Sequence, residues 1–197
     1  MGTAHFGVDL SAWNELDSAG ELYAALKREG GGAEPFAYLN STDPNLDAKW
    51  AALAGAGFGR HLGLYVYELD PTTTSVPTQI RRACARKAHC PVLWDSENTY
   101  GRTWAEVRAD VRQARDVTVE HRRSYATYCD LWFEEATGGL TRPLWLAEPG
   151  VGHPSVTCLV WQRSWTAELP GMGNPTDLDT WMGNDATFRT FFEGFYR

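Results

Sequence analysis

Cysteine is scarce and scattered in this chain of 197 residues. The four cysteines are Cys84, Cys90, Cys129 and Cys158, and none of them belongs to a Cys-x-x-Cys pair. This pattern argues against a disulfide scaffold and against a structural zinc site. We expect four reduced and mostly buried thiols, with a Cys84–Cys90 disulfide as the alternative if the protein is exported.

Long apolar runs and an excess of positive charge are also missing. No stretch approaches the roughly 18 apolar residues of a membrane span. The net charge of −7 makes the chain a poor candidate for binding nucleic acid, which needs clustered Lys and Arg. Residues 1–6 lack the basic and apolar regions of a signal peptide, so we expect a protein that stays in the cytoplasm or leaves it by another route.

Aromatic rings, in contrast, are abundant: the chain has nine Trp, eight Tyr and eight Phe. Many must fill a core, and Phe188, Phe191, Phe192 and Phe195 recur at helical spacing, which predicts a buried helix face. A surplus of flat rings also suits stacking against sugars, so carbohydrate is a candidate ligand. With 43% apolar and 22% charged residues, the composition predicts one globular domain over residues 1–197.

Extended apolar runs alternate along the chain with amphipathic segments. Capping boxes at Ser18–Glu21 and Thr103–Glu106 predict two helix starts, and we expect Asp43, Asp130 and Asp185 to cap three more helices. The apolar runs predict strands over 6–10, 36–40, 61–67, 91–97, 124–129, 143–147, 158–162 and 177–181.

This alternation predicts an α/β fold: a single compact, irregular TIM-like β/α barrel of about eight strands and five to six helices, with some helices missing. In such barrels the chemistry lies at the carboxyl ends of the strands. Here those ends are rich in acids and amides, namely Asp9, Asn40, Glu68, Asp95 with Glu97, Asp130, Glu148 and Gln162. Carboxylates gathered at one rim would repel each other, a cost that is normally tolerated only where function requires it.

The Asp95-Ser96-Glu97 tripeptide is the sharpest local signal. Residues i and i+2 of a strand face the same side, with Cβ atoms roughly 6–7 Å apart. Two carboxyl groups at that spacing can flank a glycosidic bond, one protonating the leaving oxygen while the other faces the developing positive charge. A metal site is the competing use of such acids, but no His-x-His or Glu-x-x-His accompanies them, so we expect neither a metal nor a cofactor.

Several weak motifs, in order along nearly the whole chain, resemble the family 25 glycoside hydrolases. These enzymes are lysozymes that cut peptidoglycan at N-acetylmuramic acid. Residues 7–14 are similar to the opening strand of the family, and residues 91–97 are similar to its Asp-x-Glu strand. Residues 43–57, 63–65, 125–128, 144–147, 160–162 and 177–179 resemble later elements of the family in the same order.

The resemblance implies roles for individual residues. Glu97 would be the catalytic acid and Asp95 its partner, with Asp9 and Asp177 in the active site. It further implies a neighbouring-group reaction, in which Asp95 orients the 2-acetamido group of the substrate. We expect the substrate to be contacted by Trp13, Tyr65, Tyr67, Tyr128, Trp161 and Gln162, with Trp13 and Trp161 as the sugar-stacking rings.

Three strand ends depart from the family pattern. An aromatic residue is common after the sixth strand, where this chain has Glu148-Pro149 after Ala147. A Lys-Ala-Thr-Glu-Gly sequence usually ends the second strand, where this chain has Leu39-Asn40-Ser41-Thr42. A Tyr-His-Phe usually ends the third, where this chain has residues 65–68, Tyr-Val-Tyr-Glu. The leading hypothesis is a muramidase that cleaves the β-1,4 bond between N-acetylmuramic acid and N-acetylglucosamine. The alternative is a non-hydrolytic glycan-binding or structural tail module with the same fold.

The expected partner is bacterial cell-wall glycan. Without a signal peptide, a lysozyme of this kind is often a phage product. We therefore expect a phage protein that is either held in the host cytoplasm until a holin releases it or carried on the virion with tail proteins.

Overall fold

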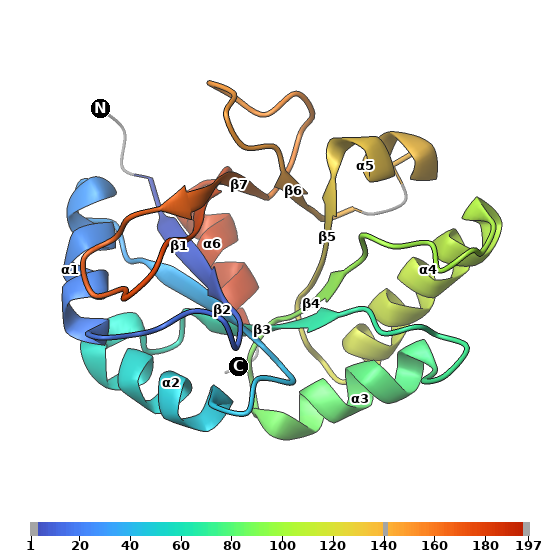
Figure 1. The fold of residues 1–197 in the computed structure, drawn as a ribbon, viewed down its shortest axis with the longest axis horizontal. Coiled ribbons are helices and arrows are strands. Elements are labelled where there is room, and N and C mark those ends of the chain that lie inside the picture. Colours follow the sequence, from blue (N-terminus) through green and yellow to red (C-terminus); the bar gives the residue numbers. More distant parts are fainter. Residues whose placement is uncertain (1–3, 140–141, 195–197) are drawn as a thin grey trace.

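Eight strands close into a barrel in the computed structural model, which describes residues 4–139 and 142–194 (Figure 1). Neighbouring strands in the chain are neighbours in the barrel, and the last strand pairs with the first. The predicted α/β barrel is therefore confirmed. Its strands are β1 (Phe6–Leu10), β2 (Phe36–Asn40), β3 (Leu62–Tyr67), β4 (Val92–Asp95), β5 (Tyr125–Asp130), β6 (Leu144–Ala147), β7 (Val160–Ala167) and β8 (Thr176–Trp181).

Helices cover only part of the barrel. Over the described residues no helix joins β6 to β7 or β7 to β8, and none is long and apolar enough to cross a membrane. The ring of helices is thus incomplete, as the sequence predicts. The helices are α1 (Ala19–Glu29), α2 (Leu46–Leu53), the π-helical turn η1 (Ala54–Phe58), α3 (Val76–Arg86), α4 (Trp104–Glu120), α5 (Leu131–Thr137) and α6 (Asp185–Glu193).

Three of the predicted helix starts are confirmed by their capping hydrogen bonds. The Ser18 hydroxyl accepts from the backbone N–H of Glu21, and Thr103 and Glu106 form a reciprocal capping box. The Asp130 carboxylate accepts from the backbone N–H of Phe133 at 2.7 Å. These side chains satisfy amide groups that the first helical turn leaves unpaired.

Two predicted caps are wrong, each by one or two positions. The helix α2 begins after Asn45, and the Asp43 carboxylate precedes it, accepting from the Asn45 backbone N–H at 2.7 Å and from Lys49 Nζ at 2.8 Å. The last helix is capped by Asn184, whose side chain accepts from the N–H of Thr187, so Asp185 lies in the first turn.

The strand β8 runs opposite to the others. Strands β1 to β7 pair in parallel, whereas β8 is antiparallel to both β7 and β1. With no helix between β7 and β8, the chain turns back directly instead of crossing over. The beginning of β8 therefore lies beside the carboxyl ends of the parallel strands, and this reversal brings Asp177 to that rim.

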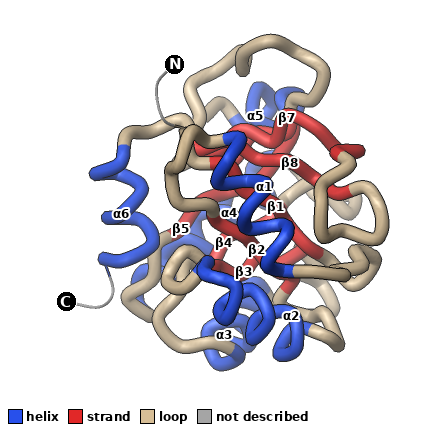
Figure 2. Tube along the Cα trace, turned by 90° about the vertical axis from the view of Figure 1, so that its left-hand side faces the viewer, coloured by secondary structure: helices blue, strands red, loops and turns tan. Residues whose placement is uncertain are grey.

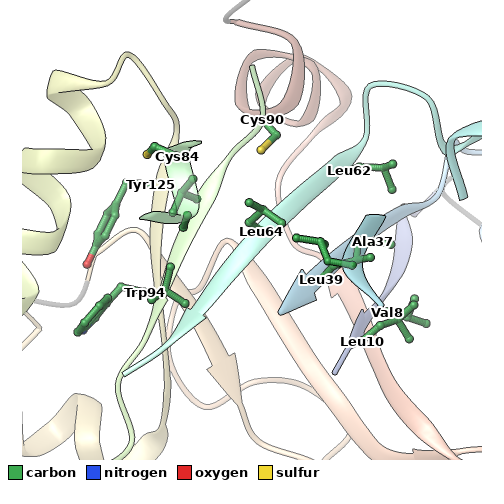
Figure 3. Close-up of a cluster of buried hydrophobic side chains, with 14 of the residues drawn as sticks. Val8, Leu10, Ala37, Leu39, Leu62, Leu64, Cys84, Cys90, Trp94 and Tyr125 are labelled. Carbon is green, nitrogen blue, oxygen red and sulfur yellow. The ribbon is translucent and has the colours of Figure 1, made fainter. Parts of the chain in front are cut away.

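The outer face of the sheet packs beneath the helices in a large apolar cluster (Figure 3) and a smaller one around Cys129, Leu144 and Leu146 of β5 and β6. Alternate residues of each strand point outward into these clusters, such as Val8 and Leu10 of β1 and Leu62 and Leu64 of β3. Because these positions face the helices, the residues between them face the barrel interior.

The three buried cysteines and the half-buried Cys158 are free thiols.

The interior of the barrel is closed at one end by aromatic rings. Phe36 and Trp181 from the strands pack against Phe188 and Phe192 of α6, which lies across the end of the barrel where β1 begins (Figure 2). The predicted buried face of this helix is confirmed for Phe188, Phe191 and Phe192. The fourth ring of that prediction, Phe195, lies outside the described residues.

Candidate active site

A cavity of about 330 Å³ opens at the other end of the barrel, where the parallel strands finish. The four predicted catalytic carboxyl groups lie together in it. Every charged residue in its lining is acidic. The lining consists of Asp9, Ser11, Trp13, Asn40, Tyr65, Tyr67, Asp95, Glu97, Tyr128, Trp145, Gln162 and Asp177.

Strand alternation explains why these acids face inward. In β1 the neighbours of Asp9 are Val8 and Leu10, which lie in the outer core. In β4 the residue before Asp95 is Trp94, which also faces outward. Glu97 follows two residues after Asp95 and shares its side of the chain.

The residue between the two acids is anchored behind the strand. Ser96 is 1% exposed, and its hydroxyl donates to Glu68 Oε2 at 2.8 Å. The other oxygen of Glu68 accepts from Arg102 Nη2 at 2.6 Å, and Arg102 also pairs with Asp110. This buried network holds the chain that follows β4, and with it the side chains of Asp95 and Glu97.

Asp9 lies deep in the cavity, with only 8% of the residue exposed. Its Oδ2 accepts from Gln162 Nε2 at 2.8 Å. Burial raises the pKa of Asp9 well above its usual range, and the charges of Asp179 and Asp177 raise it further, while the Gln162 hydrogen bond opposes them. The contact with Asp177 adds to the raised pKa of Asp9, and the same contact partly opposes the effect of burial on the pKa of Asp177.

Asp95 and Glu97 are both shifted toward the protonated form. Asp95 is 6% exposed, and burial, followed by the charges of Glu97 and Glu68, raises its pKa well above the usual range. Glu97 reaches the mouth of the cavity, and partial burial, followed by the charges of Asp130 and Asp177, raises its pKa as well. Burial and the neighbouring charges thus favour a proton on this pair of carboxyl groups.

A hydrogen-bonded network fixes the wall opposite these acids. The amide oxygen of Gln162 accepts from the Tyr128 hydroxyl and from Trp165 Nε1, both at 2.8 Å, while its nitrogen donates to Asp9. Gln162 is 1% exposed, so a single buried amide orients a carboxyl group, a tyrosine and an indole ring. Trp165 itself is 57% exposed and lies outside the residues that sequence reasoning selected.

Five of the six predicted substrate-binding residues line the cavity. Tyr65 and Tyr128 are nearly buried in its wall, whereas Tyr67 is 44% and Trp13 is 85% exposed at the mouth. Gln162 lies in the wall as described. Their contact with a substrate stays a prediction.

The sixth, Trp161, lies outside the cavity. It is 8% exposed, and its indole N–H donates to the backbone oxygen of Glu148 at 2.9 Å. Its neighbours in β7, Val160 and Gln162, face the barrel interior, so alternation turns Trp161 outward. This position does not support the predicted stacking of Trp161 against a sugar.

Three other acids expected at the rim have structural roles instead. Glu68 pairs with Arg102 behind the strand, and Asp130 caps α5. Glu148 accepts from the backbone N–H and the hydroxyl of Ser155. The carboxyl groups that face the cavity or lie beneath it are those of Asp9, Asp95, Glu97, Asp177 and the buried Asp179, while Glu68 and Asp130 act on them only through their charge.

Trp145 and Asp179 are site residues that the sequence analysis did not select. Trp145 lines the cavity floor, and its Nε1 donates to Asp179 Oδ1 at 2.8 Å. Asp179 is fully buried and lies two residues after Asp177 on the same side of β8. The Asp-x-Asp spacing of β8 was the available signal, since it parallels the Asp-x-Glu spacing of β4.

No group of His, Cys, Asp and Glu able to hold a metal ion exists among the residues that the structure describes. The cavity lining contains neither His nor Cys, and Gln162 donates a hydrogen bond to its carboxyl group Asp9. This donor set matches acid–base chemistry better than ligation of a transition metal.

No protein-family model and no curated protein matches the sequence. Solved structures do match the fold over nearly the whole chain. The bacterial lysozyme from Streptomyces coelicolor superimposes with a TM-score of 0.82 at 20% identity, covering 98% of each chain. A family 25 glycosyl hydrolase from Bacillus anthracis gives a TM-score of 0.72 at 15% identity, covering 95% of this chain and 93% of that one.

This chain has the fold of the family 25 lysozymes. A third match is the catalytic domain of endolysin ply40 from bacteriophage P40 of Listeria monocytogenes, with a TM-score of 0.70 at 16% identity over 95% of this chain and 97% of that one. The resemblance suggested by the sequence motifs is thus confirmed for the barrel and its strand order. The chemistry rests on the residues in the cavity.

Proposed function

We propose that this protein is a peptidoglycan hydrolase that cleaves the β-1,4 bond between N-acetylmuramic acid and N-acetylglucosamine. The observation that carries the proposal is the meeting of Asp9, Asp95, Glu97 and Asp177 in one cavity at the carboxyl end of the barrel. The likeness to lysozymes supports the substrate class. An endolysin with a TM-score of 0.66 to this chain was crystallised with a peptidoglycan analogue, which supports it further.

Glu97 acts as the general acid in this proposal. It lies at the mouth of the cavity, where a glycosidic oxygen can reach it, and its raised pKa favours the protonated form that a general acid needs. Asp95 lies deeper on the same strand face. Because both acids approach the sugar from one rim, Asp95 is poorly placed for direct attack from the opposite face of the ring.

The nucleophile is therefore the 2-acetamido oxygen of the substrate. Glu97 protonates the leaving oxygen, the acetamido oxygen bonds to the anomeric carbon, and the C–O bond to the leaving sugar breaks. Asp95 accepts a hydrogen bond from the acetamido N–H as positive charge develops on that group. Its Oδ1 has no hydrogen-bond partner among the described residues, so it is available for this contact.

Substrate binding decides which of the two acids, Asp95 or Glu97, carries the proton. In the free protein burial favours the protonated form of Asp95 as well as of Glu97. An N–H donated to Asp95 stabilises its ionised form and leaves the shared proton on Glu97. Water then gives a proton to Glu97 and adds to the anomeric carbon, which restores the acetamido group and retains the anomeric configuration.

The departures from the family pattern leave this machinery intact. Glu68, which follows β3, points behind the strand toward Ser96 and Arg102. Asn40 at the end of β2 lines the cavity without adding charge. The changed residues at these strand ends alter the surface that a substrate would contact. This change favours the alternative function, a glycan-binding or tail module.

Release of reducing ends from purified peptidoglycan separates the two functions. Wild type should release them, and Glu97→Gln should lower the rate by roughly 10²–10⁴ with an unchanged melting temperature, because the amide cannot deliver a proton. Glu120→Gln, a surface substitution at the end of α4, serves as the matched control. Binding of wild type to cell walls without release of reducing ends would support the binding module.

The acetamido route has its own test. Glycan strands whose cleaved sugar lacks the acetyl group should resist wild type, and chemical re-acetylation should restore cleavage. A covalent ester trapped on Asp95, or equal cleavage of both strands, would make Asp95 an ordinary nucleophile.

The similarity to a phage endolysin supports a role in a phage lytic cycle. Both routes to the cell wall remain part of the proposal: release from the host cytoplasm by a holin, or carriage on the virion beside tail proteins. Two measurements on purified virions distinguish these routes: detection of this chain with an antibody, and the lytic activity of the virions on cell walls.

A further inference from the structure

A second cavity, of about 470 Å³, lies beside the acidic one. It is a groove between the loop that follows β2 and the helix α3. Figures 1 and 2 show α2 and α3 as neighbours on this side of the barrel. The two cavities share Tyr67 as a lining residue. In the loop, Asn40 lines the acidic cavity and the next two residues line the groove, so a bound chain can pass from one to the other across one strand end.

The groove differs from the active-site cavity in charge. Its charged lining residues are Arg82 and Arg86, both exposed on α3, and no acid contributes to the lining. Arg86 approaches Asp47 of α2 at 3.6 Å, a long contact between two solvent-exposed groups. No ion pair of Arg82 is found within residues 4–139 and 142–194, so this cation is available to a ligand.

The apolar part of the groove is preformed. Val66 and Ala83 form a buried floor, and Leu69 presents a side chain that is 44% exposed. The loop carrying Leu69 is held by Gln79, which is 5% exposed, accepts from the Leu69 N–H at 2.9 Å and donates to the Leu69 oxygen at 3.1 Å. A wall fixed in this way need not be ordered when a ligand binds.

We propose that this groove binds the acidic peptide that is attached to the muramic acid residues of the glycan. The inference rests on the proposed function. The sugars of such a strand are neutral apart from the peptide substituents, which carry free carboxylates and small apolar side chains. The acidic cavity repels those carboxylates, whereas Arg82 and Arg86 attract them and the floor around Val66 accommodates methyl and methylene groups.

The test compares two substrates made from one preparation of peptidoglycan strands. One set keeps its peptides, and the other is stripped of them by an amidase. The measured quantity is the ratio of kcat/KM for the peptide-bearing strands to kcat/KM for the stripped strands. Arg82→Glu should lower this ratio roughly tenfold, because an attractive charge is replaced by a repulsive one. Arg81→Glu, the same charge change one residue away and outside the groove, should leave it unchanged.

An equal effect of Arg82→Glu and Arg81→Glu on the ratio would overturn the inference while leaving the proposed hydrolysis intact. Failure of wild type to cut either strand would overturn the proposed hydrolysis instead. In that case calorimetric titration with a soluble muramyl peptide and with the peptide-free disaccharide decides. Preferential binding of the muramyl peptide that Arg82→Glu abolishes supports the groove, and equal or absent binding of the two overturns it.

Discussion

The two ends of the barrel interior are built from the same strands with opposite chemistry. At one end Phe36, Tyr38 and Trp181 form a continuous aromatic cluster with the rings of α6. At the other end Asp9, Asp95 and their neighbours face a cavity. Along β2 the inward residues change from Phe36 and Tyr38 to Asn40, and along the antiparallel β8 they change from Trp181 to Asp179 and Asp177.

This gradient separates stability from chemistry along the barrel axis. Burial of aromatic surface at the closed end stabilises the fold. Burial of carboxyl groups at the open end costs free energy, which is seen in the raised pKa of Asp9, Asp95 and Asp179. Substitutions at the closed end should therefore change the free energy of unfolding, and those at the open end should change activity.

The largest effect on stability is expected for Phe192→Ala. Phe192 is fully buried and packs on Phe36, Tyr38 and Trp181, so its removal leaves a cavity and should lower the free energy of unfolding by about 3–5 kcal/mol. Urea denaturation followed by circular dichroism measures it. Trp13→Ala, an exposed ring at the open end, should cost about 0.5 kcal/mol or less. Comparable losses for the two rings would contradict the division between the ends.

A smaller loss is expected from overfilling the closed end. A Cβ added at Gly63 would lie 2.6 Å from the ring of Tyr38, so Gly63→Ala forces the aromatic cluster apart and should cost about 1–3 kcal/mol. The matched control is Gly20→Ala in α1, where no atom lies within 4 Å and alanine should stabilise the helix by about 0.5–1 kcal/mol. A thermal shift of the same sign for both variants would show that the ring of Tyr38 moves aside freely.

Much of the open end could be predicted because strand alternation is strict in β1 and β4. Alternation predicts that Asp9 and Asp95 face the barrel interior, and the predicted order of strands brings them to the same rim. Both residues line the cavity. The same rule would have excluded Trp161, since Gln162 and Trp161 cannot both face the cavity from adjacent positions of one strand.

Other features depend on contacts distant in the sequence. Glu68 turns away from the rim because Arg102 lies 34 residues further on, a pairing that no local pattern indicates. Trp165 lies near Gln162 because the register of β7 against β8 shifts between residues 162 and 167. Such irregularities break the period-two pattern on which strand predictions depend.

The smallest expected effect concerns Asp177 and has a sign that depends on pH. Burial raises the pKa of Asp177 from 3.8 to about 6. The folded state therefore binds a proton more tightly than the unfolded state, and this contribution to stability is fully present below pH 3.8 and is lost as the pH rises through about 6.

Asp177→Asn removes the ionised form, so it should stabilise the protein by about 1–2 kcal/mol at pH 7, a value reduced for partial solvent exposure. The gain should be much smaller at pH 4, where the folded wild type is protonated at this position and its unfolded state is only partly ionised. Urea denaturation of both proteins at pH 4 and at pH 7 measures the difference, and Asp70→Asn, at an exposed acid whose pKa is lowered, should show no gain at pH 7. If the same Asp177→Asn variant loses hydrolytic activity while it gains stability, the carboxyl groups at the open end serve the reaction and destabilise the fold. A loss of stability at pH 7 would instead make Asp177 part of the structural framework.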